Sequence, residues 1–258
     1  MSLSRTALRL ATMEALAPSA AVLANTGPWP TLATKYVYDS AIDPIEDLQP
    51  TERRPIAVIY TEDDAGEGGQ KAGGPPFKRI VDLVIELSVA VMLPDGDVFV
   101  AGLPITDGEL ESSLDLFEGQ VLFALMIGPT GMLWRSLTAR RVSETHSVPK
   151  RTGEEGIRLA MRTLRLKTQI PDDVYPAAPE SAPVGNDALP EPLKTVIAAL
   201  AAGSYGAKLG AGLSPAAPGM PVMTPLNTVT LDLQPGSASA PHDAAKPQIN
   251  ATADDLQS

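Results

Sequence analysis

The sequence predicts an α+β fold, with a mainly antiparallel sheet of about four strands covered by two helices. Three patterns support this prediction: a continuous β-branched apolar run at 55–61, an alternation of apolar and polar residues at 79–93, and an apolar face of helical spacing at 106–127. Two further strands, expected near 137–145 and 156–168, follow one another without a helix between them. Consecutive strands of this kind favour antiparallel hairpins, which the helices then cover.

The first predicted helix spans residues 4–17. Ser4 is placed to cap it, apolar residues recur along one face, and Pro18 ends it. Residues 18–54 contain several Pro and Gly breakers and are predicted to be loop-like. Within them, residues 36–38 are expected to form a short extended piece.

The strand at 55–61 is followed by a glycine-rich segment. Residues 65–76 contain five glycines and two prolines, so we predict a mobile loop that orders on assembly. A phosphate-binding loop is disfavoured, because the segment lacks a Gly-Lys-Ser/Thr ending and opens no helix.

The alternation at 79–93 is the strongest signal in the chain. A side-chain period of two places seven apolar residues on one face of the sheet; they are Val81, Leu83, Ile85, Leu87, Val89, Val91 and Leu93. The helix at 106–127 opens on a predicted capping box of Thr106 and Glu109 and offers an apolar face to cover this strand. Residues 149–153 are expected to turn the chain between the last two strands.

The chain divides by composition into two parts. We expect an α/β domain at 1–170 and a largely irregular, Pro/Ala-rich extension at 171–258. The extension holds 13 of the 25 prolines and no arginine, and only a short helix near 192–202 is predicted in it. If the extension instead wraps a partner subunit, residues 222–224 and 229–233 are its candidate strands.

The composition excludes several functional classes. The chain has no cysteine, which rules out disulfides, thiol catalysis and cysteine metal sites. Its two histidines, His146 and His242, stand alone. Charged residues interrupt every apolar stretch before about 18 residues, so no membrane span is expected, and the N-terminus lacks the pattern of a signal peptide. We therefore predict no catalytic residue, no cofactor and no metal.

One enzymatic alternative stays open. A metal-dependent nuclease would use the carboxylates of Asp63, Asp64, Asp82 and Glu86. Such a site would also use a lysine shortly after the last acid, and no lysine follows Glu86. A solvated strand end is the favoured interpretation of these acids.

A basic segment lies within this acidic chain, whose net charge is −11. Residues 135–167 carry nine basic and three acidic residues and create a local positive field. The candidate contacts to a neighbouring subunit or to DNA are Arg140, Arg141, Arg158 and Arg162. We favour a contact with the acidic residues 106–118 of the next subunit. The alternatives are a lumen that faces DNA and a solvated sheet face with ion pairs.

Two tryptophans, Trp29 and Trp134, are candidate interface anchors. Aromatic side chains are enriched at the centres of protein interfaces. The equally open alternative places both side chains in the core of one subunit.

Several stretches of the chain resemble the tail-terminator (tail-completion) proteins of long-tailed bacteriophages. They are residues 7–16, 37–40, 54–63, 109–118 and 156–162. The resemblance is one of order, length and texture across the predicted domain. The extension after residue 170 is longer than this family leads us to expect.

The resemblance implies a small α/β domain that assembles as a ring, usually a hexamer, caps the tail tube and provides the surface that joins the head. It implies four partners: the chain itself, the tail tube protein, a head-connector or neck protein, and passing genomic DNA. The location implied is the virion, assembled in the host cytoplasm. The alternatives are another head–tail connector or neck protein, and a cytoplasmic adaptor domain with a disordered tail.

Overall fold

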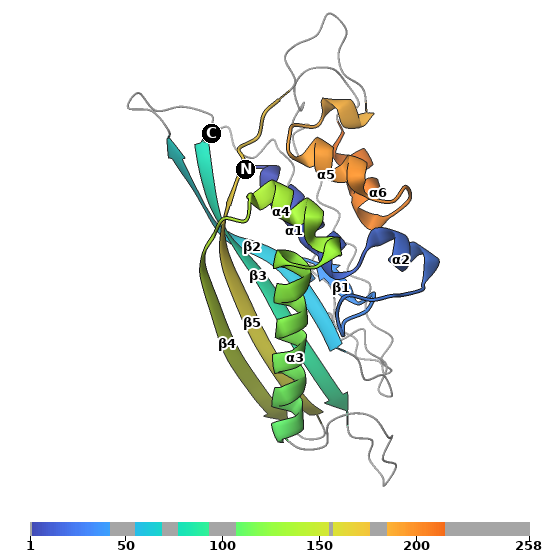
Figure 1. Cartoon of the computed structure of the whole chain (residues 1–258), viewed down its shortest axis with the longest axis vertical. Coiled ribbons are helices and arrows are strands. Elements are labelled where there is room, and N and C mark those ends of the chain that lie inside the picture. Colours follow the sequence, from blue (N-terminus) through green and yellow to red (C-terminus); the bar gives the residue numbers. More distant parts are fainter. Residues whose placement is uncertain are drawn as a thin grey trace, which may run out of the picture. The chain divides into compact units, whose positions relative to one another are not determined.

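The computed structural model describes residues 2–41, 55–68, 77–92, 107–154, 157–175 and 185–214. Their centre is a five-stranded sheet of order β1-β2-β3-β5-β4 (Figure 1). The strands are β1 (Val37–Asp39), β2 (Pro55–Gly68), β3 (Phe77–Met92), β4 (Val142–Glu154) and β5 (Ile157–Ile170). Only β1 and β2 pair in parallel, and the other neighbours are antiparallel. The α+β class and the mainly antiparallel sheet are thus confirmed, and the short piece expected at 36–38 supplies the fifth strand.

Helices pack against one face of this sheet and around its β1 end (Figure 1). The α-helices are α1 (Ser4–Leu16), α2 (Ser19–Ala24), α3 (Asp107–Met126), α4 (Met132–Thr138), α5 (Leu193–Ala199) and α6 (Tyr205–Leu213). Two 3-10 turns accompany them, η1 (Pro129–Gly131) and η2 (Gly185–Ala188). The two helices predicted to cover the sheet correspond to α1 and α3, and the described residues contain four more, among them α5.

The core lies between the sheet and α1 and α3. The alternation of β3 has the predicted effect: Val81, Leu83, Ile85, Leu87 and Val89 are all buried in one cluster with the inner face of α3. Val91 lies in β3, but its side chain is outside the described set, as is the whole of Leu93. Thr106 also falls outside it, so the predicted capping box stays a prediction.

The β4–β5 hairpin corrects the predicted strand positions. Residues 137–138, expected in a strand, end helix α4, and β4 begins at Val142. The turn predicted at 149–153 is strand, since Pro149 pairs with Arg162 and Gly153 with Arg158. Proline has no N–H to donate, and an edge strand such as β4 tolerates it.

The first four residues of the predicted glycine-rich loop belong to a strand. Residues 65–68 continue β2 and pair with residues 77–80 of β3, after a register shift between Thr61 and Asp64. The remainder of the predicted loop, residues 69–76, lies outside the described residues.

The compact part of the chain continues beyond residue 170, where the sequence placed its end. Leu189, Leu193, Val196 and Ile197 are buried in the same cluster as the sheet and α1. The helix predicted near 192–202 exists as α5. Although the composition of this region cannot build a second core, its few apolar residues complete the first one.

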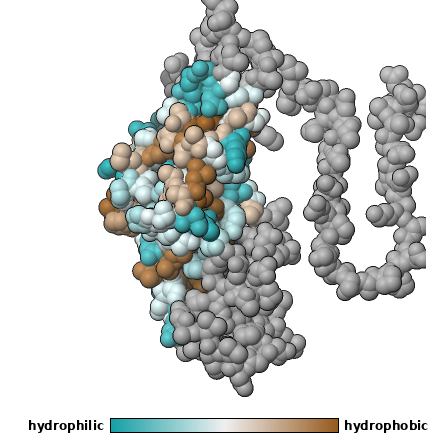
Figure 2. All heavy atoms as spheres, turned by 90° about the vertical axis from the view of Figure 1, so that its right-hand side faces the viewer, coloured by the Kyte–Doolittle hydropathy of each residue, from teal (hydrophilic) through white to brown (hydrophobic). Residues whose placement is uncertain are grey.

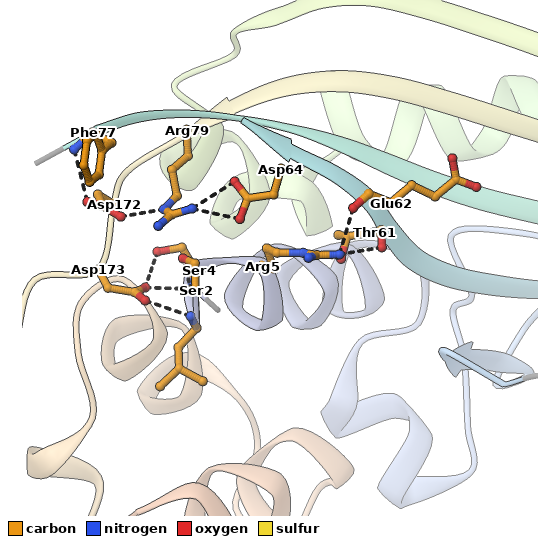
Figure 3. A network of polar contacts seen from close by, with 11 residues as sticks. Ser2, Ser4, Arg5, Thr61, Glu62, Asp64, Phe77, Arg79, Asp172 and Asp173 are labelled. Atoms are coloured by element: carbon orange, nitrogen blue, oxygen red, sulfur yellow. Dashed lines mark hydrogen bonds and ion pairs between the residues drawn. The ribbon is translucent and has the colours of Figure 1, made fainter. Parts of the chain in front are cut away.

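The two acids after β5 hold distant segments together (Figure 3). Asp173 accepts hydrogen bonds from the backbone N–H groups of Leu3, at 2.8 Å, and Ser4, at 2.7 Å. The Ser4 hydroxyl also donates to Asp173, at 2.5 Å. A carboxylate at this position satisfies free N–H groups and the positive end of the helix dipole. Thus Asp173 caps α1, and Ser4, the predicted cap, is its first residue.

Asp172 joins β3 to the same segment (Figure 3). It accepts from the Phe77 N–H at 3.1 Å and from Arg79 Nε at 2.5 Å, while Arg79 Nη1 donates to Asp64 at 2.8 Å. Burial alone would raise the pKa of Asp172, but these hydrogen bonds outweigh it and hold the pKa below its ordinary value. The carboxylate therefore stabilises the folded chain in its charged form.

Candidate assembly surface

The predicted contact between the basic strands and the acidic helix exists within one chain. The alternation of β5 turns Arg162 towards α3, where its Nη1 donates to Asp115 at 2.5 Å and to Glu118 at 2.9 Å. Arg162 Nη2 donates to Glu111, one turn earlier on α3. Since these acids lie on one flank of the helix, three carboxylates converge on one guanidinium.

The Arg162 guanidinium keeps its positive charge in this cluster. Burial alone lowers the pKa of the Arg162 guanidinium, but hydrogen bonds to Asp115 and Glu118 outweigh it, and the pKa lies above its ordinary value. With 9% of its surface exposed, Arg162 cannot offer this charge to a second subunit without breaking its own contacts. The pairing expected between subunits is therefore made inside one subunit.

The other candidate arginines do not join this cluster. Arg140 and Arg141 are exposed at the corner between α4 and β4, where the Arg141 carbonyl accepts from the Gln169 N–H. Arg158 pairs with Val91 across the other end of β5, and its side chain is outside the described set. The four residues are thus spread along the hairpin rather than gathered in one basic patch.

The two tryptophans differ in environment. Trp134 is 1% exposed and belongs to the hydrophobic core, so its predicted role as an interface anchor is corrected to a core role. Its position on the inner side of α4 explains this burial. Trp29 is half-buried in the segment after α2 and remains a candidate.

The carboxylates of the nuclease alternative lie on opposite faces of the sheet. Asp64 points to the helix-covered side and pairs with Arg79. Asp82 and Glu86 lie on the opposite face, where Glu86 accepts from the Tyr60 hydroxyl at 2.7 Å. No group of three or more potential metal ligands occurs among the described residues.

The same face carries a small polar hollow of about 300 Å³, lined by Asp82, Glu144, His146, Arg165 and Lys167. Both signs of charge meet there, and Arg165 pairs with Asp82 at 3.8 Å and with Glu62. Mixed charges of this kind give no net attraction for an anion. The hollow is a solvated, ion-paired surface.

The outer edge of β4 is an open surface. The strand has 13 residues and pairs with β5 on one side only (Figure 1). Residues 143–150 are exposed, and within the described residues their outward backbone groups have no strand partner. Pro149 and the charged side chains along β4 are typical protection against indiscriminate edge-to-edge pairing.

An apolar stripe runs along the outward side of α3. Leu116, Phe123 and Ile127 are 56%, 55% and 69% exposed, and their spacings of seven and four place them on one side of the helix. Met132, at the start of α4, is exposed beside its end. We call these four residues the α3 stripe. The helical spacing at 106–127 predicted only the opposite, buried face, although the same spacing rule also finds this exposed one.

The connection from α3 to α4 is tightly packed. A Cβ at Gly131 would lie 2.1 Å from the carbonyl oxygen of Ala124, so a larger residue does not fit, whereas a Cβ at Gly119 meets open space.

In the described part of the chain, no single helix is long and apolar enough to cross a membrane. Residues 108–126 and 129–138 satisfy that test only as a pair bent by 51°.

Comparison with known proteins adds no assignment. No protein-family model matches the chain, and no curated protein is significantly similar to it.

Proposed function

We propose that this chain is a virion structural protein of a long-tailed bacteriophage, a tail terminator. Its copies form a ring, a hexamer by the family resemblance, that caps the tail tube and provides the head-joining surface. In this role the chain carries out no catalysis and needs no cofactor, and it assembles in the host cytoplasm. The observation that carries the proposal is the pair of unlike open surfaces on one domain: the edge of β4 and the α3 stripe.

Two unlike surfaces are what a ring requires. In a closed ring each subunit uses one surface to bind the preceding copy and a different surface to bind the next. The β4 edge offers backbone hydrogen-bonding groups, and the α3 stripe offers apolar side chains. The two surfaces belong to different layers, since β4 is an edge of the sheet and α3 covers one sheet face.

The energetics favour assembly that depends on a template. Fully burying a Leu, Ile or Phe side chain contributes about 1.5–3 kcal/mol. Each of the three leading stripe residues is already partly covered, so the three together would contribute about 3 kcal/mol. Association costs at least about 4 kcal/mol in lost motion. We therefore expect subunits that are largely monomeric when dilute and that close into a ring on the end of a tail tube.

A contact with passing DNA would involve the exposed corner of Arg140 and Arg141. Within the described residues these side chains have no acidic partner to give up, unlike Arg162. The net charge of −11 disfavours tight DNA binding by the chain as a whole. A weakly attractive lumen suits DNA that has to pass through it.

The test compares the wild-type chain with two matched double variants. Phe123→Gln with Ile127→Gln removes most of the α3 stripe, whereas Val174→Gln with Tyr175→Gln removes two similarly exposed apolar side chains elsewhere. Native mass spectrometry and electron microscopy, with and without polymerised tail tubes, read the assembly.

We expect rings on tube ends for the wild type and the control, and at least tenfold fewer for the stripe variant. A wild-type chain that stays monomeric and leaves tube ends uncapped contradicts the proposal. Binding to a head connector but not to tubes would assign the chain to the neck instead.

A further inference from the structure

A groove opens beside β1, on the side of the described domain that carries α2 and α6 (Figure 2). Its volume is about 340 Å³, near the lower end of the range for ligand-binding pockets. Its apolar lining comes from segments far apart in the sequence and includes Met13 of α1, Val22 of α2, Val37 of β1 and Leu200 after α5. The volume suits a small ligand rather than a long lipid chain.

Polar contacts hold the walls of this groove in place. Ser19 Oγ accepts from the Ala201 N–H at 2.9 Å, which joins α2 to the segment between α5 and α6. The Tyr205 hydroxyl donates to Asp39 at 3.0 Å, and Arg9 Nε donates to the same carboxylate at 2.6 Å. These two contacts join β1 to both α6 and α1. Because the walls are already fixed, a ligand would bind with little ordering of the protein.

The acidic groups that reach the groove are bonded within the chain. The charge of Asp39 is balanced by Arg9, and Glu14 accepts from the Ser19 N–H at 2.8 Å. The Ser204 hydroxyl accepts from the first turn of α6, which it caps. The rest of the lining is largely apolar, so the groove suits a ligand that is apolar over most of its surface.

One cation at the groove keeps spare donors. Lys35 is exposed and lines the groove. Its Nζ donates to Asn25 Oδ1 at 2.6 Å and lies 5.6 Å from the centre of the Tyr36 ring. Among the described residues it has no acidic partner. An ammonium group carries three N–H donors, and the contact with Asn25 uses only one of them.

The apolar lining and the single free cation together specify an amphipathic anion. An apolar tail gains by leaving water for the groove, and an anionic head gains charge-assisted hydrogen bonds from the Lys35 ammonium. A carboxylate at the mouth also stays partly hydrated, so it avoids the cost of burying a charge.

We propose that this groove binds a medium-chain carboxylate, a fatty-acid-like anion, with its tail against Met13, Val37 and Leu200 and its head on Lys35. This inference does not depend on the phage assignment, because the groove belongs to one chain whether or not the chain forms a ring.

Calorimetry of the full-length chain with octanoate tests the head group, and octanol serves as the neutral ligand with the same tail. Lys35→Met removes the ammonium at the groove, whereas Lys35→Arg keeps a positive charge there. Lys208→Met is the matched control, since Lys208 is also exposed but does not line the groove.

We expect Lys35→Met to weaken octanoate binding about fivefold, the upper limit for an exposed ion pair, and to leave octanol binding unchanged. Lys35→Arg should restore most of the affinity for octanoate, and Lys208→Met should change neither ligand. Octanoate binding that ignores Lys35→Met, or octanol binding that weakens equally, overturns the anionic class of ligand.

The tail is tested by chain length and by position. Hexanoate should bind about fifteenfold more weakly than octanoate, because each buried methylene contributes roughly fourfold. In methyl NMR spectra, octanoate should shift the signals of Met13 and Val37 and leave that of Val174, which is 57% exposed outside the groove. Equal shifts at Val174, or no binding of octanoate below its micelle-forming concentration, overturn the proposal.

Discussion

Replacing Arg162 with methionine tests whether its cluster stabilises the subunit or the assembly. Methionine keeps much of the apolar stem of arginine and removes its charge and hydrogen bonds. The structure places the acidic partners, Asp115, Glu118 and Glu111, on α3 of the same chain. We therefore expect the isolated subunit to lose stability, whereas the contact between subunits predicted from sequence would leave it unchanged.

The exposure of the acidic partners of Arg162 determines how much stability the substitution removes. Removing one member of a buried ion pair costs about 3–5 kcal/mol, mostly because a charge is left without a partner. The Asp115 side chain is 63% exposed and regains water, whereas Glu118 is 17% exposed and does not. We expect Arg162→Met to lower the free energy of unfolding by about 2–3 kcal/mol.

The assay is urea unfolding of the dilute monomer, with Arg140→Met as the control for an exposed arginine. A double-mutant cycle with Glu118→Gln should give a coupling energy of about 1–2 kcal/mol. Because the pair lies within one chain, this coupling should not change when the protein concentration is raised tenfold.

A stable Arg162→Met monomer would contradict a role of this cluster within one chain. If Arg162→Met changes the unfolding free energy of the monomer by no more than the Arg140→Met control, within about 0.5 kcal/mol, and yet abolishes ring formation, the cluster acts between subunits. The rings and monomers would then contain different pairings of the same residues.

Three further predictions concern the rest of the fold. Asp173→Ala should cost about 2 kcal/mol in urea unfolding through loss of the α1 cap, whereas the exposed acid control Asp63→Ala should cost less than about 0.5 kcal/mol. Gly131→Ala should lower the melting temperature because its Cβ has no room, while Gly119→Ala should raise stability by about 0.5–1 kcal/mol through helix propensity. Since the pKa of Asp172 is lowered in the folded chain, its contribution is complete above about pH 5 and is lost on further acidification. Asp172→Asn should therefore flatten the fall in unfolding free energy between about pH 5 and pH 2, measured by urea titration at each pH.

The sequence alone determined the elements with a strong local period. The alternation of β3 and the helical spacing of α3 each predict one buried face, because the direction of a side chain follows directly from the period of the backbone. The same rule applied to the other side of α3 would have revealed its exposed stripe. The positions of β4 and α4 were missed because their short apolar runs fit a strand and a helix equally well.

Which distant groups meet depends on the tertiary structure. The sequence showed a basic segment and an acidic helix, but not that Arg162 reaches the helix of its own chain. The sequence predicted Ser4 as the cap of α1, whereas in the fold the capping group is Asp173, 169 residues away along the chain. It could not tell whether Trp134 is core or interface, or that α5 completes the core. Local propensity acts over a few neighbouring residues, whereas ion pairing, capping and burial depend on the path of the whole chain, and so on which segments the sheet brings together.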